Sequence, residues 1–123
     1  MKQYIMATVV VMAMILPGCG KNDQDKIVTE FCRALDAGRL DEALSYMSHN
    51  AQIELEKKGG KALLATATEQ LRQHRGIKSL KVTAKESVGK DILLSVVYKL
   101  NDGTEMFDKI PVTKEGSSWK IAK

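Results

Sequence analysis

Apolar residues recur at helical spacing between residues 27 and 75, and from residue 77 onward they alternate with polar residues. The helical spacing predicts three helices, over 27–37, 40–47 and 61–75. Gly38 and Gly76 are natural helix ends, and Gly59-Gly60 breaks the chain before the third helix. Ser48 is expected to cap a further turn.

A period of two predicts strands in the second half of the chain. A nearly all-apolar strand over 92–100 is expected at the centre of a sheet, and Asn101-Asp102-Gly103 suits a three-residue hairpin loop. The register set by this loop pairs Leu100 with Thr104, Lys99 with Glu105, Tyr98 with Met106, Val97 with Phe107, Leu94 with Ile110 and Ile92 with Val112.

A turn at Glu115-Gly116 predicts a last strand, on which Trp119 faces Val112 and Ile121 faces Ile110. Pro111 cannot donate to a sheet ladder, so we expect a bulge there. Together these elements predict an α+β fold, in which three N-terminal helices pack on a four-stranded antiparallel meander.

Several short segments form a further pattern: Val28-Thr29-Glu30-Phe31, Ala34-Leu35, Gly38, Ala43-Leu44, Met47-Ser48, Gly59-Gly60 and Gly116-Ser117-Ser118-Trp119-Lys120-Ile121. This pattern resembles the lipoprotein-attached domain of unknown function 4878, a family of the nuclear transport factor 2-like (NTF2-like), cystatin-like superfamily. It departs from the family at Leu40, where such domains often carry an aromatic residue. The resemblance implies a cone-shaped fold with a curved sheet and a lipid anchor, and it implies no known chemistry.

The N-terminal segment predicts a cellular address. Lys2 precedes an apolar run from Tyr4 to Leu16, which is shorter than the ~20 residues of a membrane span and suits a signal-peptide core. Leu16-Pro17-Gly18-Cys19 resembles the lipobox of bacterial lipoproteins, although proline is less usual at its second position. In that family, type II signal peptidase cuts before the cysteine, whose thiol carries a diacylglyceryl group.

We therefore expect a signal peptide over 1–18, a lipidated polar tether over 19–25 and the α+β domain over 26–123. Acylated Cys19 is expected to anchor the chain to a lipid membrane of the cell envelope. Gly20 stands where an aspartate would hold an enterobacterial lipoprotein at the inner membrane, so the outer membrane is favoured over the inner.

Composition adds little to this picture. The apolar fraction of 44% and the charged fraction of 28% are those of a globular domain. The net charge of +4 comes from lysines interleaved with acids, which predicts a solvated surface, with attraction to anionic lipid head groups as the sharper alternative. Nucleic acid is not expected as a partner outside the cytoplasm.

The sequence contains no familiar catalytic or metal-binding spacing, and we expect neither a metal nor a cofactor. His49 and His74 are expected to be solvated, and Cys32 to be a small buried hydrophobe rather than a reactive thiol.

Asp108 and Tyr98 are the weak catalytic candidates. The predicted register points Asp108 inward between Met106 and Ile110, where a buried carboxylate without a partner would have a raised pKa. A bulge that turns Asp108 outward, or a partner such as Tyr98 or a lysine, is the alternative.

The outer face of the sheet is the candidate docking surface. Leu93, Val97 and Phe107 are predicted there, beside Lys99, Glu105 and Lys109, while the neighbouring strand is expected to present Ser79, Lys81, Thr83 and Lys85. An apolar island within a charged rim is typical of a patch that binds a second copy or an envelope protein, although scattered exposed apolar residues are also ordinary.

Two function classes follow. The favoured one is a membrane-anchored, non-catalytic binding or scaffolding domain, and so not an enzyme. The alternative is a small-molecule pocket, or a weak hydrolase or isomerase, around Asp108 and Tyr98. An open cavity with an inward Asp108 would favour this alternative, and a closed, leucine-filled core would exclude it.

Overall fold

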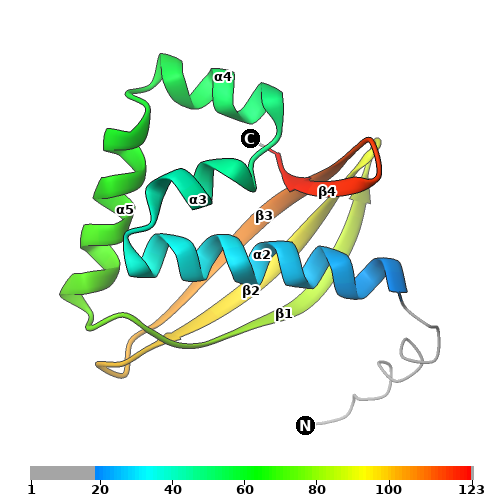
Figure 1. Ribbon diagram of the computed structural model, residues 1–123. Helices are drawn as coiled ribbons and strands as arrows, with labels where there is room; N and C mark the ends of the chain where they lie inside the picture. The colour runs from blue at the N-terminus through cyan, green and yellow to red at the C-terminus, as the bar shows by residue number, and fades with distance from the viewer. Residues whose placement is uncertain (1–18, 123) are drawn as a thin grey trace, which may run out of the picture.

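The computed structural model describes residues 19–122, which form four helices followed by a four-stranded antiparallel sheet (Figure 1). The helices are α2 (Cys19–Ala37), α3 (Leu40–Ser45), α4 (His49–Lys57) and α5 (Lys61–Gln73). The strands are β1 (Ile77–Val88), β2 (Asp91–Leu100), β3 (Glu105–Glu115) and β4 (Ser118–Ile121), paired in that order as a meander. The predicted signal peptide, 1–18, lies outside the described residues.

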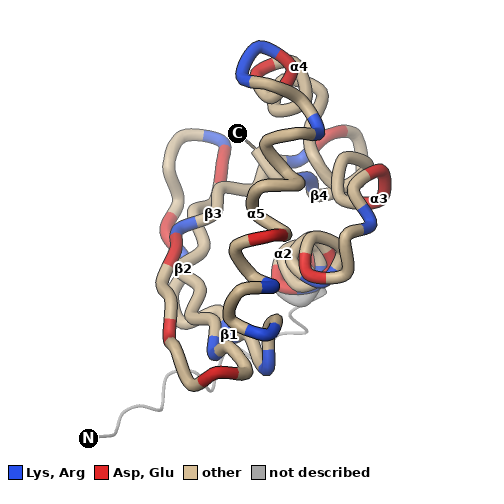
Figure 2. The backbone as a smooth tube through the Cα atoms, turned by 90° about the vertical axis from the view of Figure 1, so that its left-hand side faces the viewer, with Lys and Arg blue, Asp and Glu red and all other residues tan. Residues whose placement is uncertain are grey.

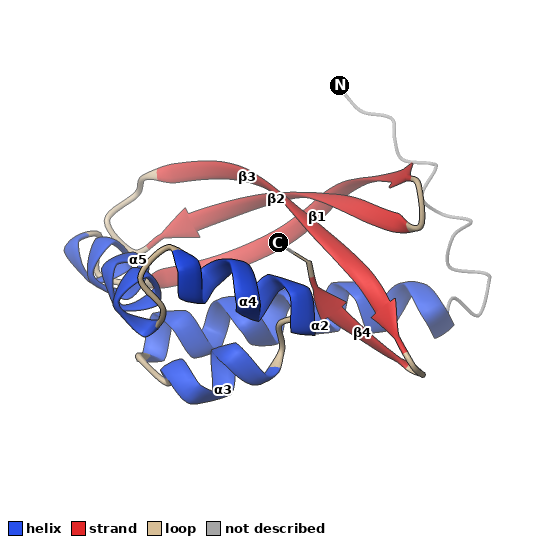
Figure 3. Cartoon of the chain, turned by 90° about the horizontal axis from the view of Figure 1, so that it is seen from above, coloured by secondary structure: helices blue, strands red, loops and turns tan. Residues whose placement is uncertain are grey.

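The helices cover one face of a curved sheet, as Figure 3 shows, so the predicted fold class is confirmed. Leu94, Val96 and Leu100 of β2 are almost fully buried and share one hydrophobic core with Val28 and Ala34 of α2, because a central strand that helices cover loses contact with water. Among the helices of residues 19–122, none combines the length and the apolar character needed to cross a membrane.

The first helix is longer than predicted. Residues 19–25, which we expected to form a tether, are the first turns of α2. Asp25 lies on this part of the helix and forms an ion pair with Lys85 of β1 at 3.0 Å, which holds the beginning of the helix against the sheet. A polar composition suggested a free tether, whereas Asp25 of this segment has a partner on the sheet.

The predicted helix boundaries follow the expected capping chemistry. Gly38 has a φ of +76°, and the N–H of Arg39 donates to the carbonyl of Ala34 at 2.9 Å, which is the closing bond of a Schellman motif. The hydroxyl of Ser48 accepts the N–H of Ala51 at 3.1 Å, so the predicted cap begins α4.

The β2–β3 hairpin has the predicted register throughout, from Lys99 opposite Glu105 to Ile92 opposite Val112. The bulge predicted at Pro111 is wrong, because Pro111 pairs regularly with Leu93. The carbonyl of Pro111 accepts the N–H of Ala122, so the backbone polar groups of Pro111 point toward β4. The N–H that proline lacks would point the same way, and no hydrogen bond between β3 and β2 is lost.

The predicted register of β4 is wrong by two residues. Val112 pairs with Ile121, and Trp119 pairs with Lys114, whose ammonium lies 5.3 Å from the centre of the indole ring. The turn lies one position later than predicted, since Glu115 itself pairs with Ser118. Trp119 is therefore only half-buried.

A bulge between Val82 and Ala84 shifts the register of β1. Beyond it, Lys85 pairs with the buried Leu94 and turns to the helical side of the sheet, where it contacts Asp25. The prediction that Lys85 lies on the outer face is therefore wrong, because the extra residue reverses the alternation of side chains.

Candidate functional site

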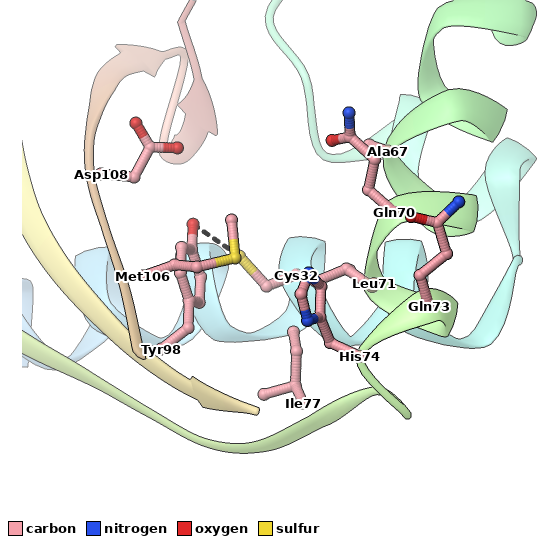
Figure 4. Close-up of a pocket in the computed structure, with 10 residues that line it drawn as sticks. All are labelled: Cys32, Ala67, Gln70, Leu71, Gln73, His74, Ile77, Tyr98, Met106 and Asp108. Atoms are coloured by element: carbon pink, nitrogen blue, oxygen red, sulfur yellow. Dashed lines mark hydrogen bonds between the residues drawn. The ribbon is translucent and has the colours of Figure 1, made fainter. Parts of the chain in front are cut away.

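A cavity of about 470 Å³ lies between α5, α2 and the inner face of the sheet (Figure 4). Its apolar wall consists of Ala67, Leu71, Ile77, Met106 and the ring of Tyr98, and its polar lining consists of Cys32, Gln70, Gln73, His74 and Asp108. The core is therefore not closed at this end of the sheet. The volume falls in the range of small-molecule sites, which run from about 300 to 1,000 Å³.

Cys32 and Tyr98 lie side by side in the lining of this cavity. The Cys32 thiol donates a hydrogen bond of 3.7 Å to the Tyr98 hydroxyl. Burial raises the pKa of Cys32 to about 11, and burial together with the neighbouring thiol also raises the pKa of Tyr98. Both groups are therefore neutral at neutral pH, which suits hydrogen bonding to a ligand better than nucleophilic attack.

Asp108 lies across from these two groups on β3. It pairs with Val96, as the predicted register requires, and its carboxylate faces the cavity in Figure 4. The carboxylate is exposed at the rim rather than buried, although Asp108 pairs regularly with Val96 and no bulge turns it from the inner face. Oδ1 of Asp108 accepts the backbone N–H of Lys109 at 2.8 Å.

His74 occupies the other side of the cavity, at the end of α5. Its Nδ1 donates to Oδ2 of Asp102 at 2.7 Å, and the other carboxylate oxygen of Asp102 accepts the N–H of Thr104 at 2.9 Å. Hydrogen bonds from Thr104, and then from His74, lower the pKa of Asp102 to about 2. The imidazole thus has a carboxylate partner, and its side chain is still 38% exposed.

The β2–β3 turn is bound to the C-terminal end of α5, and this contact positions His74. The backbone N–H of Asn101 donates to the carbonyl of Gly76 at 2.9 Å, and its side-chain amide donates to the carbonyl of Arg75 at 2.8 Å. Arg75 has a φ of +69°, and this left-handed residue ends the helix one position before the predicted Gly76.

His49 lies far from this site, at the start of α4, where its backbone N–H donates to the carboxylate of Glu115. Because Glu115 and Asp102 flank opposite ends of β3, the two histidines cannot share a metal ion. Within residues 19–122, no group of three or more His, Cys, Asp or Glu side chains is arranged to hold a metal.

The predicted docking residues lie together on the outer face of the sheet. Val97 pairs with Phe107, whose side chain is 71% exposed, and Leu93 pairs with Pro111 on one side and with Glu86 on the other. Basic and acidic residues are interspersed around the molecule, as Figure 2 shows. A partner for this face stays a prediction.

A family comparison agrees with this architecture. The model of a domain of unknown function, DUF4878, matches residues 17–122. The chain belongs to the DUF4878 family. A comparison of this DUF4878 protein with curated proteins finds no significant match.

Solved structures similar to this DUF4878 domain share its fold. A crystal structure from Campylobacter jejuni, described as a suspected NTF2-like transpeptidase, superimposes with a TM-score of 0.68 at 14% identity, over 82% of this chain and 98% of the other. A de novo designed protein of the NTF2 fold superimposes with a TM-score of 0.50 at 14% identity, over 80% of each chain. The NTF2-like fold is therefore confirmed, and identities this low say nothing about activity.

Proposed function

We propose that this DUF4878 protein is a lipid-anchored, non-catalytic binding domain of the cell envelope that holds a small molecule in the cavity beside α5. The open cavity carries this proposal, because its apolar wall can bury the body of a ligand and its few polar groups can orient it. It favours ligand binding over a purely scaffolding role.

The state of the polar groups favours binding over catalysis. The Cys32 thiol is protonated at neutral pH and directed to Tyr98. Asp108, the acid of the hydrolase or isomerase alternative, is exposed, so it lacks the burial that activates a general base by desolvation. A ligand would meet hydrogen-bonding groups rather than an activated nucleophile.

The position of the cavity suggests where its ligand comes from. Cys19 begins α2 and Cys32 lies thirteen residues later on the same helix, which is roughly 20 Å along the axis at about 1.5 Å per residue. If Cys19 carries the acyl chains, the cavity lies up to about 20 Å from the anchored end of the helix, which leaves room for a solute of the envelope to reach it.

The anchor is tested by labelling. Cells that express the full chain are fed radioactive palmitate, and the chain is expected to incorporate the label and sediment with membranes. Cys19→Ala should lose both properties. Labelling that is unchanged in Cys19→Ala would contradict the anchor.

The cavity is tested by native mass spectrometry of the protein extracted from membranes. A co-purifying small molecule is expected in the wild-type chain and absent in Ala67→Phe, whose added ring would fill the cavity. Ala65→Phe is the matched control, because Ala65 is an exposed residue of the same helix that does not line the cavity. A ligand retained equally by both variants would place the binding site elsewhere.

A further inference from the structure

The charge of the cavity points to the class of its ligand, an inference that rests on the proposed function. Besides Cys32 and Tyr98, the lining contains two ionisable side chains, Asp108 and His74. His74 is already bound to the carboxylate of Asp102, which balances any positive charge on the imidazole. Among the described residues that line the cavity, none is a lysine or an arginine.

Asp108 has no ion-pair partner within residues 19–122. Lys109 follows it on the strand, and both residues also line a hollow on the outer face with Thr83 and Phe107. Successive side chains of a strand point to opposite faces, and no ion pair joins Lys109 to Asp108. The carboxylate therefore lines the cavity without an ion-pair partner among the described residues.

The negative charge of Asp108 acts on the interior of the cavity. It contributes, after burial, to raising the pKa of both Cys32 and Tyr98. Since these two groups are neutral at neutral pH, they do not offset this charge. An anionic ligand would meet an unbalanced carboxylate, whereas a cationic group would balance it.

We propose that the cavity binds an organic cation, with an ammonium group at Asp108 and an apolar body against Tyr98, Ile77 and Met106. Figure 4 shows Asp108 and the amides of Gln70 and Gln73 on opposite walls, so a ligand that spans the cavity meets a carboxylate at one side and amides at the other. The amides accept and donate hydrogen bonds and add no charge.

The test compares three ligands that share a phenyl ring and a two-carbon chain: phenethylamine, phenethyl alcohol and phenylacetate. The full chain is placed in lipid nanodiscs with its methionine methyl groups labelled for NMR. Met106 lines the cavity, while Met47 is buried in the core and does not, so Met47 is the internal control. Empty nanodiscs correct for partition of each ligand into lipid.

All binding is followed by the shift of the Met106 signal. The Kd of the amine is expected to be about three- to fivefold below that of the alcohol, which is the size of effect that an ion pair at an exposed carboxylate gives. Phenylacetate is expected to bind most weakly. Asp108→Asn should bring the Kd of the amine to that of the alcohol and leave the alcohol unchanged. Glu105→Gln is the matched control, because Glu105 is an exposed acid of the same strand that does not line the cavity, and it should preserve the ranking.

Two other outcomes would overturn either the cationic ligand alone or the binding site as well. Equal affinities for the three ligands, or a ranking that persists in Asp108→Asn, would overturn the cationic ligand and leave the cavity as a binding site. No shift of Met106 with any of the three ligands would overturn both the cationic ligand and the proposed small-molecule site.

Discussion

The Cys32 thiol of α2 donates its hydrogen bond to the Tyr98 hydroxyl of β2 across 3.7 Å, and this contact joins the longest helix to the central part of the sheet at the cavity. Burial, and to a lesser extent the negative charge of Asp108, raise the pKa of both partners. The pair therefore belongs to the packing of the domain and presents only neutral polar atoms to a ligand.

The reactivity of Cys32 follows from its burial. With a pKa of about 11, the thiol is ionised in only about one molecule in a thousand at pH 8. In a chain with Cys19→Ser, Cys32 is the only thiol, and iodoacetamide should alkylate it at least about 100-fold more slowly in the folded protein than in urea. Similar rates in the two states, followed by mass spectrometry, would mean that Cys32 is open to solvent.

The depressed pKa of Asp102 predicts the direction of a pH effect. Hydrogen bonds to its ionised form stabilise the fold above the ordinary aspartate pKa of about 4, and this contribution is lost as the pH falls toward about 2. Asp102→Asn should therefore be less stable than the wild type at neutral pH, and the gap should narrow between about pH 4 and pH 2. Urea titrations across this pH range measure the difference in unfolding free energy between the two proteins. A difference that grows on acidification would contradict the lowered pKa of Asp102.

Gly76 is expected to tolerate a side chain poorly. Its φ is +86°, and an added Cβ would lie 3.1 Å from Oδ1 of Asp36, whose other oxygen accepts the N–H of Ile77. Gly103→Ala is the matched control, because it has a similar φ of +93° but open space around the added atom. Backbone strain should lower the free energy of unfolding of both alanine variants by about 1–2 kcal/mol. The contact with Asp36 should lower that of Gly76→Ala by about 1 kcal/mol more, as measured by urea unfolding.

The two faces of the sheet should respond differently to truncation. Leu94 is fully buried, so Leu94→Ala should cost about 2–5 kcal/mol, whereas Phe107→Ala should cost under about 1 kcal/mol because its side chain is 71% exposed. Urea unfolding of both variants measures this contrast. A large loss of stability in Phe107→Ala would mean that the outer face is covered in the folded molecule.

The outer face also carries the predicted self-association. If Leu93, Val97 and Phe107 bind a second copy, Val97→Lys should shift the sedimentation of the full chain in nanodiscs from dimer to monomer and leave its melting temperature within a few degrees. A wild-type chain that sediments as a monomer at high concentration would remove this prediction.

Local chemistry explains which parts of the fold could be predicted. The register of β2 and β3 was predictable because Asn101-Asp102-Gly103 specifies a loop of one length, and the alternation of side chains supports a single pairing. The Ser48 cap and the Gly38 helix end are likewise local. The register of β4 was not predictable, because Gly116 fits either of two adjacent positions in the turn between β3 and β4.

The cavity lay beyond local patterns. His74 and Asp102 are 28 positions apart, and they meet only because the β2–β3 turn binds the end of α5. The exposure of Asp108 depends on where the helices leave the inner face uncovered, which a strand pattern does not encode. The bulge that turns Lys85 inward has no sequence signal of its own, since Thr83 is an ordinary strand residue.

The last strand closes the domain against its first half. The backbone N–H of Ser48 donates to the carbonyl of Ile121 and the N–H of Ile121 donates to the carbonyl of Tyr46, which joins the connection between α3 and α4 to the C-terminal end of the chain. The helical half of the domain and its last strand therefore cannot separate without breaking these two hydrogen bonds, so the two parts should unfold together as one cooperative unit.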